Sequence, residues 1–393
     1  MDLTPKELAR YSRHLRLNRF GKEAQERLKG SSALIVGLGG LGSPAALYLA
    51  AAGVGRLGLA DFDTVAEHNL QRQILHDTPS VGETKWSSAK ERLNRINPHV
   101  TLEEHPEGIT VENALSIFSR YDIIVDGSDN FPTRYLNNDA AVLAGKPLVY
   151  GSVFQFDGQV ALFDPARGGA CYRCLFPEPP EPETIPNCDE AGVLGALCGV
   201  VGSLQALEAI KYLGGVSEPS AGSTQLLLLD SWGTQFDQIQ ISKNPECPVC
   251  AKGGRIQRLR SEEYEFTCAV ESPATSVAHM NASIENPPLE IDIRTAKDWL
   301  EAEGESVVLV DVREPFEVEI CQIDGSLTIP MGQVPERLSD FSSDKTYVIQ
   351  CHHGSRSLQV TEFLRHQGFS KVTNMAGGID AWAAELEPSM ARY

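Results

Sequence analysis

The N-terminal half of the chain is organised around one segment, Ser32-Ala33-Leu34-Ile35-Val36-Gly37-Leu38-Gly39-Gly40-Leu41-Gly42. Its first five residues predict an apolar β-strand, and the Gly-x-Gly-x-x-Gly spacing that follows lets the backbone approach a phosphate group. A helix of small residues is expected over 43–52, and a second strand over 56–60 leads into Asp61. This βαβ pattern, with an acidic residue about 20 positions after the loop, is typical of nucleotide binding. Further strands over 121–126 and 148–153 indicate an α/β fold with a parallel sheet.

The glycine loop alone does not identify the nucleotide, because a turn with no ligand or a nicotinamide site would also fit it. Arg72 and Lys85 follow Asp61 and supply cations suited to a triphosphate. Asp129 follows the strand over 121–126, where a carboxylate can hold Mg²⁺. Alone, each of these cations would more often be a solvated surface charge. Together they favour ATP over a nicotinamide cofactor.

Two Cys-x-x-Cys pairs, Cys171/Cys174 and Cys247/Cys250, suggest a metal centre. Each pair can bind one tetrahedral ion from one side, and two pairs complete a closed Cys₄ zinc site. The competing interpretations are a redox motif or buried apolar cysteines. With four protein ligands the ion has no open position, so its expected role is structural.

The composition changes after Cys250. Residues 252–287 are rich in charge, Ser, Asn and Pro and predict a linker, which leaves a first domain over 1–251. Residues 288–393 form a second expected α/β domain, in which strands over 307–310 and 347–350 alternate with helices.

The second domain contains the hexapeptide Cys351-His352-His353-Gly354-Ser355-Arg356, between an apolar strand and a helix. Backbone N–H groups converge at such a turn and the helix dipole is positive there, which favours a thiolate or a persulfide on Cys351. A metal site using the two histidines, an inert buried thiol and a phosphatase loop are the alternatives. The short loop favours sulfur chemistry over phosphate chemistry.

The remaining cysteines are weaker candidates. Cys188 lies in a polar segment beside Asn187 and Asp189, where it is either an exposed reactive thiol or a small buried hydrophobe. Cys198 is expected to pack inside a helix, and no role is assigned to it, to Cys268 or to Cys321.

The overall composition limits the partners and the compartment. The 393 residues include 34 basic and 53 acidic side chains, and the net charge of −19 argues against direct binding to nucleic acid. There is no signal segment, and no apolar run approaches about 20 residues, so a soluble cytoplasmic protein without membrane association is expected. Nine cysteines in such a chain indicate ligands or reactive thiols rather than disulfides.

Two resemblances cover nearly the whole chain. Residues 1–251 resemble the ubiquitin-activating-enzyme-like adenylyltransferases of molybdopterin and thiamin biosynthesis, with a Rossmann-like domain. The matching elements are Arg10-Tyr11-Ser12-Arg13, the loop 37–42, Asp61-Phe62-Asp63, Asn69-Leu70-Gln71-Arg72-Gln73, Lys85, Asp129-Asn130 and the two cysteine pairs. Residues 288–393 resemble a rhodanese domain through Asp311-Val312-Arg313-Glu314, the loop that begins at Cys351, and Gly377-Gly378-Ile379-Asp380-Ala381-Trp382. The order matches the fused adenylyltransferase–sulfurtransferases of molybdenum-cofactor synthesis.

The resemblance implies a role for each matching position. ATP would be bound by Gly40, Asp61, Asn69, Arg72, Lys85 and Asn130, with Asp129 holding Mg²⁺. Arg13 would reach as an arginine finger into the partner subunit of a homodimer. The four paired cysteines would bind structural Zn²⁺, Cys188 would capture an acyl group, and Cys351 would carry a persulfide. Its neighbours His352, His353 and Arg356 leave the preferred sulfur donor open.

The implied partners are a ubiquitin-like sulfur carrier with a C-terminal Gly-Gly and a sulfur donor such as a cysteine desulfurase. The carrier would be adenylated and then converted to a thiocarboxylate, for the molybdenum cofactor or alternatively for thiamin or cysteine biosynthesis or tRNA thiolation. A nicotinamide-linked oxidoreductase and a non-catalytic carrier-docking module are the more distant alternatives.

Overall fold

The computed structural model describes residues 2–180, 192–217, 223–264, 284, 286–303 and 306–392. The chain divides into two compact units, Met1–Val270 and Glu271–Tyr393. Tyr264, inside the range predicted as a linker, is buried in the first unit, where its hydroxyl donates to Asp139 Oδ2 at 3.0 Å.

The first unit is built on an eight-stranded sheet in the order β3-β2-β1-β4-β5-β6-β7-β8. The five strands from β3 to β5 are parallel, which confirms the expected α/β fold, and β5 to β8 are joined antiparallel. The strands are β1 (Ser32–Val36), β2 (Arg56–Ala60), β3 (Thr101–His105), β4 (Ile123–Asp126), β5 (Leu148–Phe154), β6 (Asp157–Phe163), β7 (Ser223–Asp230) and β8 (Gln235–Ser242).

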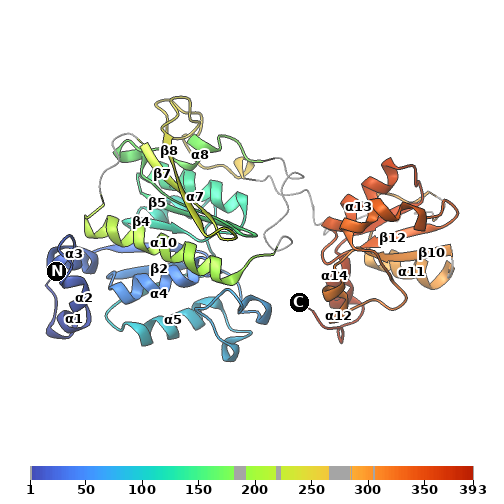
Figure 1. Cartoon of the computed structure of the whole chain (residues 1–393), viewed down its shortest axis with the longest axis horizontal. Helices are drawn as coiled ribbons and strands as arrows, with labels where there is room; N and C mark the ends of the chain where they lie inside the picture. Colours follow the sequence, from blue (N-terminus) through green and yellow to red (C-terminus); the bar gives the residue numbers. More distant parts are fainter. Residues whose placement is uncertain are drawn as a thin grey trace. The chain divides into compact units, whose positions relative to one another are not determined.

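Helices cover both faces of the parallel part of this sheet (Figure 1). Ala33 and Ile35 of β1 pack in the core with α3, α4, α5 and α10, whereas Leu34 and Val36 pack in the core with α6, α7 and the residues around α8. This alternation follows from the two-residue period of a strand. The helices are α1 (Pro5–Arg10), α2 (Ser12–Leu15), α3 (Gly21–Gly30), α4 (Gly42–Ala52), α5 (Lys85–Ile96), α6 (Ala114–Phe118), α7 (Phe131–Ala144), α8 (Tyr172–Leu175) and α10 (Gly195–Gly214), with short 3₁₀ turns η1 (Glu67–Asn69), η2 (Thr78–Ser80), η3 (Pro165–Arg167) and η4 (Ser261–Glu263).

Helix α10 is, among the described residues, the one helix long and apolar enough to cross a membrane by length and composition. No apolar run of about 20 residues was expected from the sequence, and α10 does contain the charged residues Glu208 and Lys211. Its residues Ala206 and Ala209 lie in the core shared with α4 and the sheet. Helix α10 therefore packs against the core of the first unit.

The second unit contains a five-stranded parallel sheet in the order β11-β10-β12-β13-β9. Helices α11 and α14 pack on one face, and α13 and the 3₁₀ segment η6 pack on the other. The strands are β9 (Glu290–Ile291), β10 (Val307–Asp311), β11 (Leu327–Thr328), β12 (Thr346–Gln350) and β13 (Val372–Met375), and the helices are α11 (Ile293–Glu303), α12 (Pro315–Ile320), η6 (Met331–Asp340), α13 (Ser355–His366) and α14 (Gly378–Glu385).

Candidate active sites

A pocket opens in the first unit at the carboxyl ends of β1, β2 and β4. Strands β1 and β4 are neighbours, although β1 is followed in sequence by β2 on its other side, so the pocket lies where the strand order reverses. Gly37 has a φ of +85°, and a Cβ there would lie 2.9 Å from the carbonyl oxygen of Gly127. A glycine is therefore required for the loops after β1 and β4 to meet.

Asp61 and Lys85 lie together at one wall of this pocket. The Asp61 carboxylate accepts the N–H groups of Leu38 at 2.6 Å and Asp63 at 2.9 Å, which fixes it against the glycine loop. Lys85, the buried first residue of α5, places Nζ 2.8 Å from Asp63 Oδ2 and 3.7 Å from Asp61 Oδ2. The ammonium group is thus held at the pocket by two carboxylates.

Asp129 and Asn130 line the same pocket from the segment between β4 and α7. The Asn130 side chain caps α7 by accepting the Thr133 N–H at 2.9 Å, and its amide donates to Asp129 Oδ1 at 3.2 Å. Both residues line the pocket and are exposed. A carboxylate in this place fits a hard cation such as Mg²⁺, which prefers oxygen ligands and retains several waters.

Six of the predicted nucleotide-binding residues line the pocket, whereas Asn69 and Arg13 do not. The six are Gly40, Asp61, Arg72, Lys85, Asp129 and Asn130. Asn69 is not in the lining, but its carbonyl accepts the N–H groups of Arg72 at 3.1 Å and Gln73 at 3.0 Å, so it shapes the turn that carries Arg72. Arg13 is exposed on α2 and does not line the pocket of its own chain. Cys188 falls outside the described residues.

Arg134 lines the same pocket and was not singled out from the sequence. It is 5% exposed, and its guanidinium lies 5.1 Å from the Phe131 ring centre and 5.4 Å from that of Tyr150. Burial disfavours the charged form, but Tyr150, Tyr172 and Asp126 outweigh that effect and raise the pKa of Arg134. The sequence could have indicated Arg134, because it follows Asn130, the residue that caps α7, by four positions and so lies on the same side of the helix.

Asp126, at the end of β4, is a second residue that sequence reasoning missed. Its fully buried Oδ1 accepts from the Ser128 N–H at 3.1 Å, the Ser128 hydroxyl at 2.6 Å and the Asn137 amide at 3.0 Å, and burial raises the pKa of the carboxyl group. These bonds fix the turn that presents Asp129.

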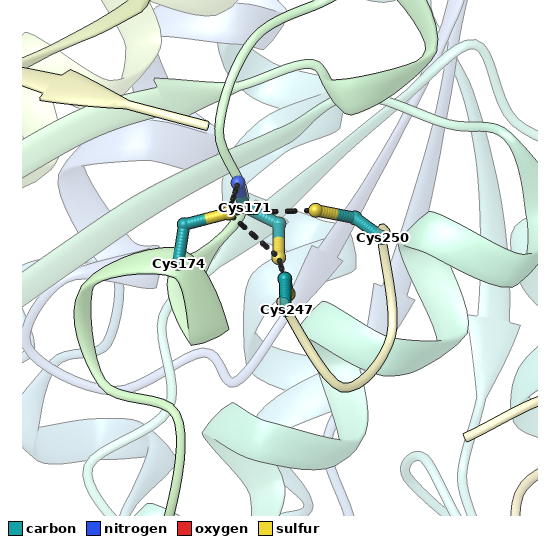
Figure 2. Close-up of side chains that lie close together, drawn as sticks. All are labelled: Cys171, Cys174, Cys247 and Cys250. Atoms are coloured by element: carbon teal, nitrogen blue, oxygen red, sulfur yellow. Dashed lines mark hydrogen bonds between the residues drawn. The ribbon is translucent and has the colours of Figure 1, made fainter. Parts of the chain in front are cut away.

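The two cysteine pairs, one at α8 and one after β8, come together in the first unit. Figure 2 shows the four sulfur atoms converging from α8 and from the segment after β8. The Sγ–Sγ distances are 3.5 Å for Cys171–Cys247, 3.4 Å for Cys174–Cys250 and 3.9 Å for Cys171–Cys174, and all four sulfurs lie within 4.8 Å of one another. A tetrahedral ion with bonds of about 2.3 Å separates its thiolates by about 3.8 Å. The cluster therefore fits a metal ion such as Zn²⁺.

The loop of residues 351–356 (the Cys351 loop) follows β12 directly. The buried Cys351 sulfur accepts the Gly354 N–H at 3.1 Å and the Ser357 hydroxyl at 3.3 Å. Gly354 has a φ of +102°, which aims its N–H at the sulfur just before α13 begins. Donors directed at the sulfur, together with the helix N-terminus, stabilise a thiolate or a terminal persulfide anion.

The two histidines of the Cys351 loop stack on each other, with ring centres 4.0 Å apart. Burial and the neighbouring His353 lower the pKa of His352 to about 4, so His352 is neutral at pH 7. His353 Nδ1 lies 3.9 Å from Asp380 Oδ2. Among the described residues, the group that could hold a metal is the four-cysteine cluster, and the alternative of a histidine metal site is not supported.

Arg356 is bound to Glu317 of α12. Its two terminal nitrogens donate to the two carboxylate oxygens at 2.8 and 2.7 Å. This bidentate pair ties the end of the Cys351 loop to a second element, which orders the loop.

Comparison with known proteins finds a family match for each of the two parts of the chain. Residues 11–249 match the ThiF family, and residues 291–385 match the rhodanese-like domain. The probable adenylyltransferase/sulfurtransferase MoeZ of Mycobacterium tuberculosis is 42% identical over 100% of this chain and 96% of MoeZ. The adenylyltransferase and sulfurtransferase MOCS3 of Anopheles gambiae is 39% identical over 98% of this chain and 89% of MOCS3.

Solved structures support the fold of the first unit. The crystal structure of E. coli MccB with MccA-N7isoASN has a TM-score of 0.55 and 24% identity, and the match covers 64% of this chain and 76% of that chain. At that identity the likeness concerns the fold alone. The expected Rossmann-like domain followed by a rhodanese domain is confirmed. The chain belongs to the ThiF family, and within it to the adenylyltransferase/sulfurtransferases that carry a rhodanese-like domain.

Proposed function

We propose that this protein uses ATP to adenylate the C-terminal glycine of a ubiquitin-like sulfur carrier and then transfers sulfur from Cys351 to form a thiocarboxylate. The observation that carries the proposal is the presence in one chain of a nucleotide pocket with converging cations and of a cysteine whose sulfur accepts two hydrogen bonds. Neither site alone makes a thiocarboxylate, because sulfur addition needs an activated acyl group.

In the first step, a carboxylate oxygen of the carrier attacks the α-phosphate of ATP, and pyrophosphate leaves. Gly40 lets the nucleotide approach the loop, while Asp61 and Asn130 order the pocket walls through the hydrogen bonds described above. Arg72 and Lys85 offset the negative charge that develops. Asp129 would hold Mg²⁺, which supplies further positive charge at the phosphates. Asn69 supports the Arg72 turn, and Arg13 is the candidate to act in the partner subunit of a homodimer.

In the second step, the outer sulfur of a Cys351 persulfide attacks the acyl carbon, and AMP leaves. The product is an acyl disulfide between Cys351 and the carrier. A second thiolate then attacks the Cys351 sulfur and expels the carrier thiocarboxylate, which leaves a protein disulfide to be reduced by a cellular thiol. Cys188 is the candidate for that thiolate. Arg356 orders the Cys351 loop through Glu317.

Cys171, Cys174, Cys247 and Cys250 would hold Zn²⁺ as a structural ion that joins α8 to the segment after β8. We place the reaction in the cytoplasm, with a cysteine desulfurase or another persulfide enzyme as the sulfur donor. Molybdenum-cofactor synthesis is the proposed pathway. Thiamin or cysteine biosynthesis and tRNA thiolation use the same chemistry with other carriers.

The adenylation half is tested by isotope exchange between pyrophosphate and ATP in the presence of candidate carriers. Exchange is expected only with a carrier that ends in Gly-Gly, and Asp129→Ala is expected to abolish it. Normal exchange by Asp129→Ala would remove the assignment of the pocket. NADH binding without carrier-dependent exchange would instead identify an oxidoreductase, and carrier binding without exchange would identify a docking module.

A further inference from the structure

The positive charge of Arg356 in the Cys351 loop is paired with the negative charge of Glu317. Arg356 directly precedes Ser357, whose hydroxyl donates to the Cys351 sulfur at 3.3 Å. Both terminal nitrogens of Arg356 are bound to Glu317, at 2.8 and 2.7 Å. The Arg356 and Glu317 side chains are only 18% and 6% exposed, so water screens the pair weakly. Glu317 therefore cancels most of the positive field that Arg356 would exert at the loop.

An acidic and a basic side chain beside the loop are likewise paired. The guanidinium of Arg392 donates to both oxygens of Asp380, at 2.8 and 3.0 Å. Asp380 in turn lies 3.9 Å from His353, which stacks on His352. His352 is neutral at pH 7, as described above. Two carboxylates thus face two guanidinium groups, and the backbone N–H groups and the start of α13 are the positive features that the described residues offer an incoming donor.

We infer that Glu317 makes the Cys351 loop select a sulfur donor of low charge, a persulfide on another thiol, over a small dianion such as thiosulfate. The inference rests on the proposed sulfur transfer to Cys351. With a persulfide donor R–S–SH, the Cys351 thiolate attacks the outer sulfur, the donor S–S bond breaks, and R–S⁻ leaves. With thiosulfate the same attack expels sulfite. A dianion that approaches a thiolate needs a cation beside it. The cation of this loop is Arg356, and its guanidinium is already paired with Glu317.

A charge series at this pair tests the inference. Glu317→Gln keeps the shape of the side chain and an oxygen for the Glu314 N–H, which Glu317 accepts at 2.9 Å, but leaves the charge of Arg356 uncancelled. We expect the KM for thiosulfate to fall about 3- to 10-fold. Arg356→Gln leaves Glu317 as the uncancelled charge, and the KM should rise. The double variant Glu317→Gln/Arg356→Gln restores neutrality, and its KM should return toward the wild-type value.

The measurement is the initial rate at which the full chain gains one sulfur on Cys351, followed by mass spectrometry at varied donor concentration. Thiosulfate is compared with the persulfide of N-acetylcysteinamide, a donor of low charge, and the ratio of the two KM values separates the effect of charge from any general effect of the substitutions on the order of the loop. Glu319→Gln is the matched control, because it removes the same charge from an exposed position on α12.

Equal thiosulfate KM values across the series, or an equal fall in Glu319→Gln, would overturn the inference. If Glu317→Gln does not fold, the rise expected in Arg356→Gln still decides it. Failure of the wild-type chain to take sulfur from either donor would be a different result, since it would overturn the proposed sulfurtransferase function itself.

Discussion

Arg134 lines the pocket that is proposed to bind the nucleotide, and its role there can be tested by substitution. It is buried, lines the pocket and keeps its positive charge. We expect Arg134→Gln to lower the rate of pyrophosphate exchange by about 10- to 100-fold, the effect of removing a charge-assisted hydrogen bond of about 1.5–3 kcal/mol. Arg134→Lys, which keeps the charge, should retain part of the activity. Normal exchange by a folded Arg134→Gln variant would exclude this role.

His352 predicts a pH dependence for the stability of the second unit. Its pKa is about 4 in the folded chain and 6.5 when unperturbed, so the unfolded state binds the proton more tightly. The resulting stabilisation is complete above pH 6.5 and is lost as the pH falls toward 4. Urea unfolding at several pH values should show a shallower decline in His352→Gln than in the wild type. His366→Gln, at the exposed end of α13, should keep the wild-type slope, and identical slopes in all three would contradict the prediction.

At the scale of elements, the loop between β1 and α4 depends on glycine. Gly37→Ala would force an alanine to a φ of +85° and place its Cβ 2.9 Å from the Gly127 oxygen. We expect the free energy of unfolding to fall by about 2 kcal/mol and ATP binding to weaken at least about tenfold. Urea unfolding and calorimetry measure both.

The control for this change is Gly199→Ala in α10, where a Cβ would meet nothing within 4 Å. A helix-interior alanine should leave stability unchanged or raise it by up to about 1 kcal/mol. A Gly37→Ala variant that binds ATP as tightly as the wild type would contradict the account of the loop.

Local patterns explain which elements were predictable. The strand, loop and helix around residues 32–52 are specified by neighbours in sequence, and they were predicted to within one residue. The antiparallel strands β6 to β8 were not identified, and β8 in particular exposes nearly every side chain, so it lacks the apolar alternation of a half-buried strand.

In the candidate sites too, the residues marked by a short sequence pattern were predicted, and those placed by tertiary contacts were not. The cysteine pairs and Cys351 were found from short spacings. The burial of Arg134 and the pairing of Arg356 with Glu317, 39 residues apart, depend on tertiary contacts that no short pattern records. The position of Cys188 lies outside the described residues, so its proposed role rests on the sequence.

The four-cysteine cluster and the Cys351 loop belong to different compact units. We expect elemental analysis to find one zinc per chain, and removal by a chelator to lower the melting temperature of the first unit by about 10 °C. Sulfur loading of Cys351 should be unchanged. Cys250→Ser should lose the metal, whereas Cys321→Ser, outside the cluster, should keep it. Purified native protein that contains no metal would contradict this prediction. Loss of sulfur loading when the metal is removed would contradict it as well.

One chain is proposed both to activate a carrier carboxylate and to supply the sulfur that replaces its oxygen. The direct measurement is mass spectrometry of a Gly-Gly carrier after incubation with the chain, Mg²⁺-ATP and a persulfide donor. The wild type should convert the carrier to a thiocarboxylate. Cys351→Ala should still catalyse pyrophosphate exchange but form no thiocarboxylate. Thiocarboxylate formation by Cys351→Ala at the wild-type rate would contradict the account.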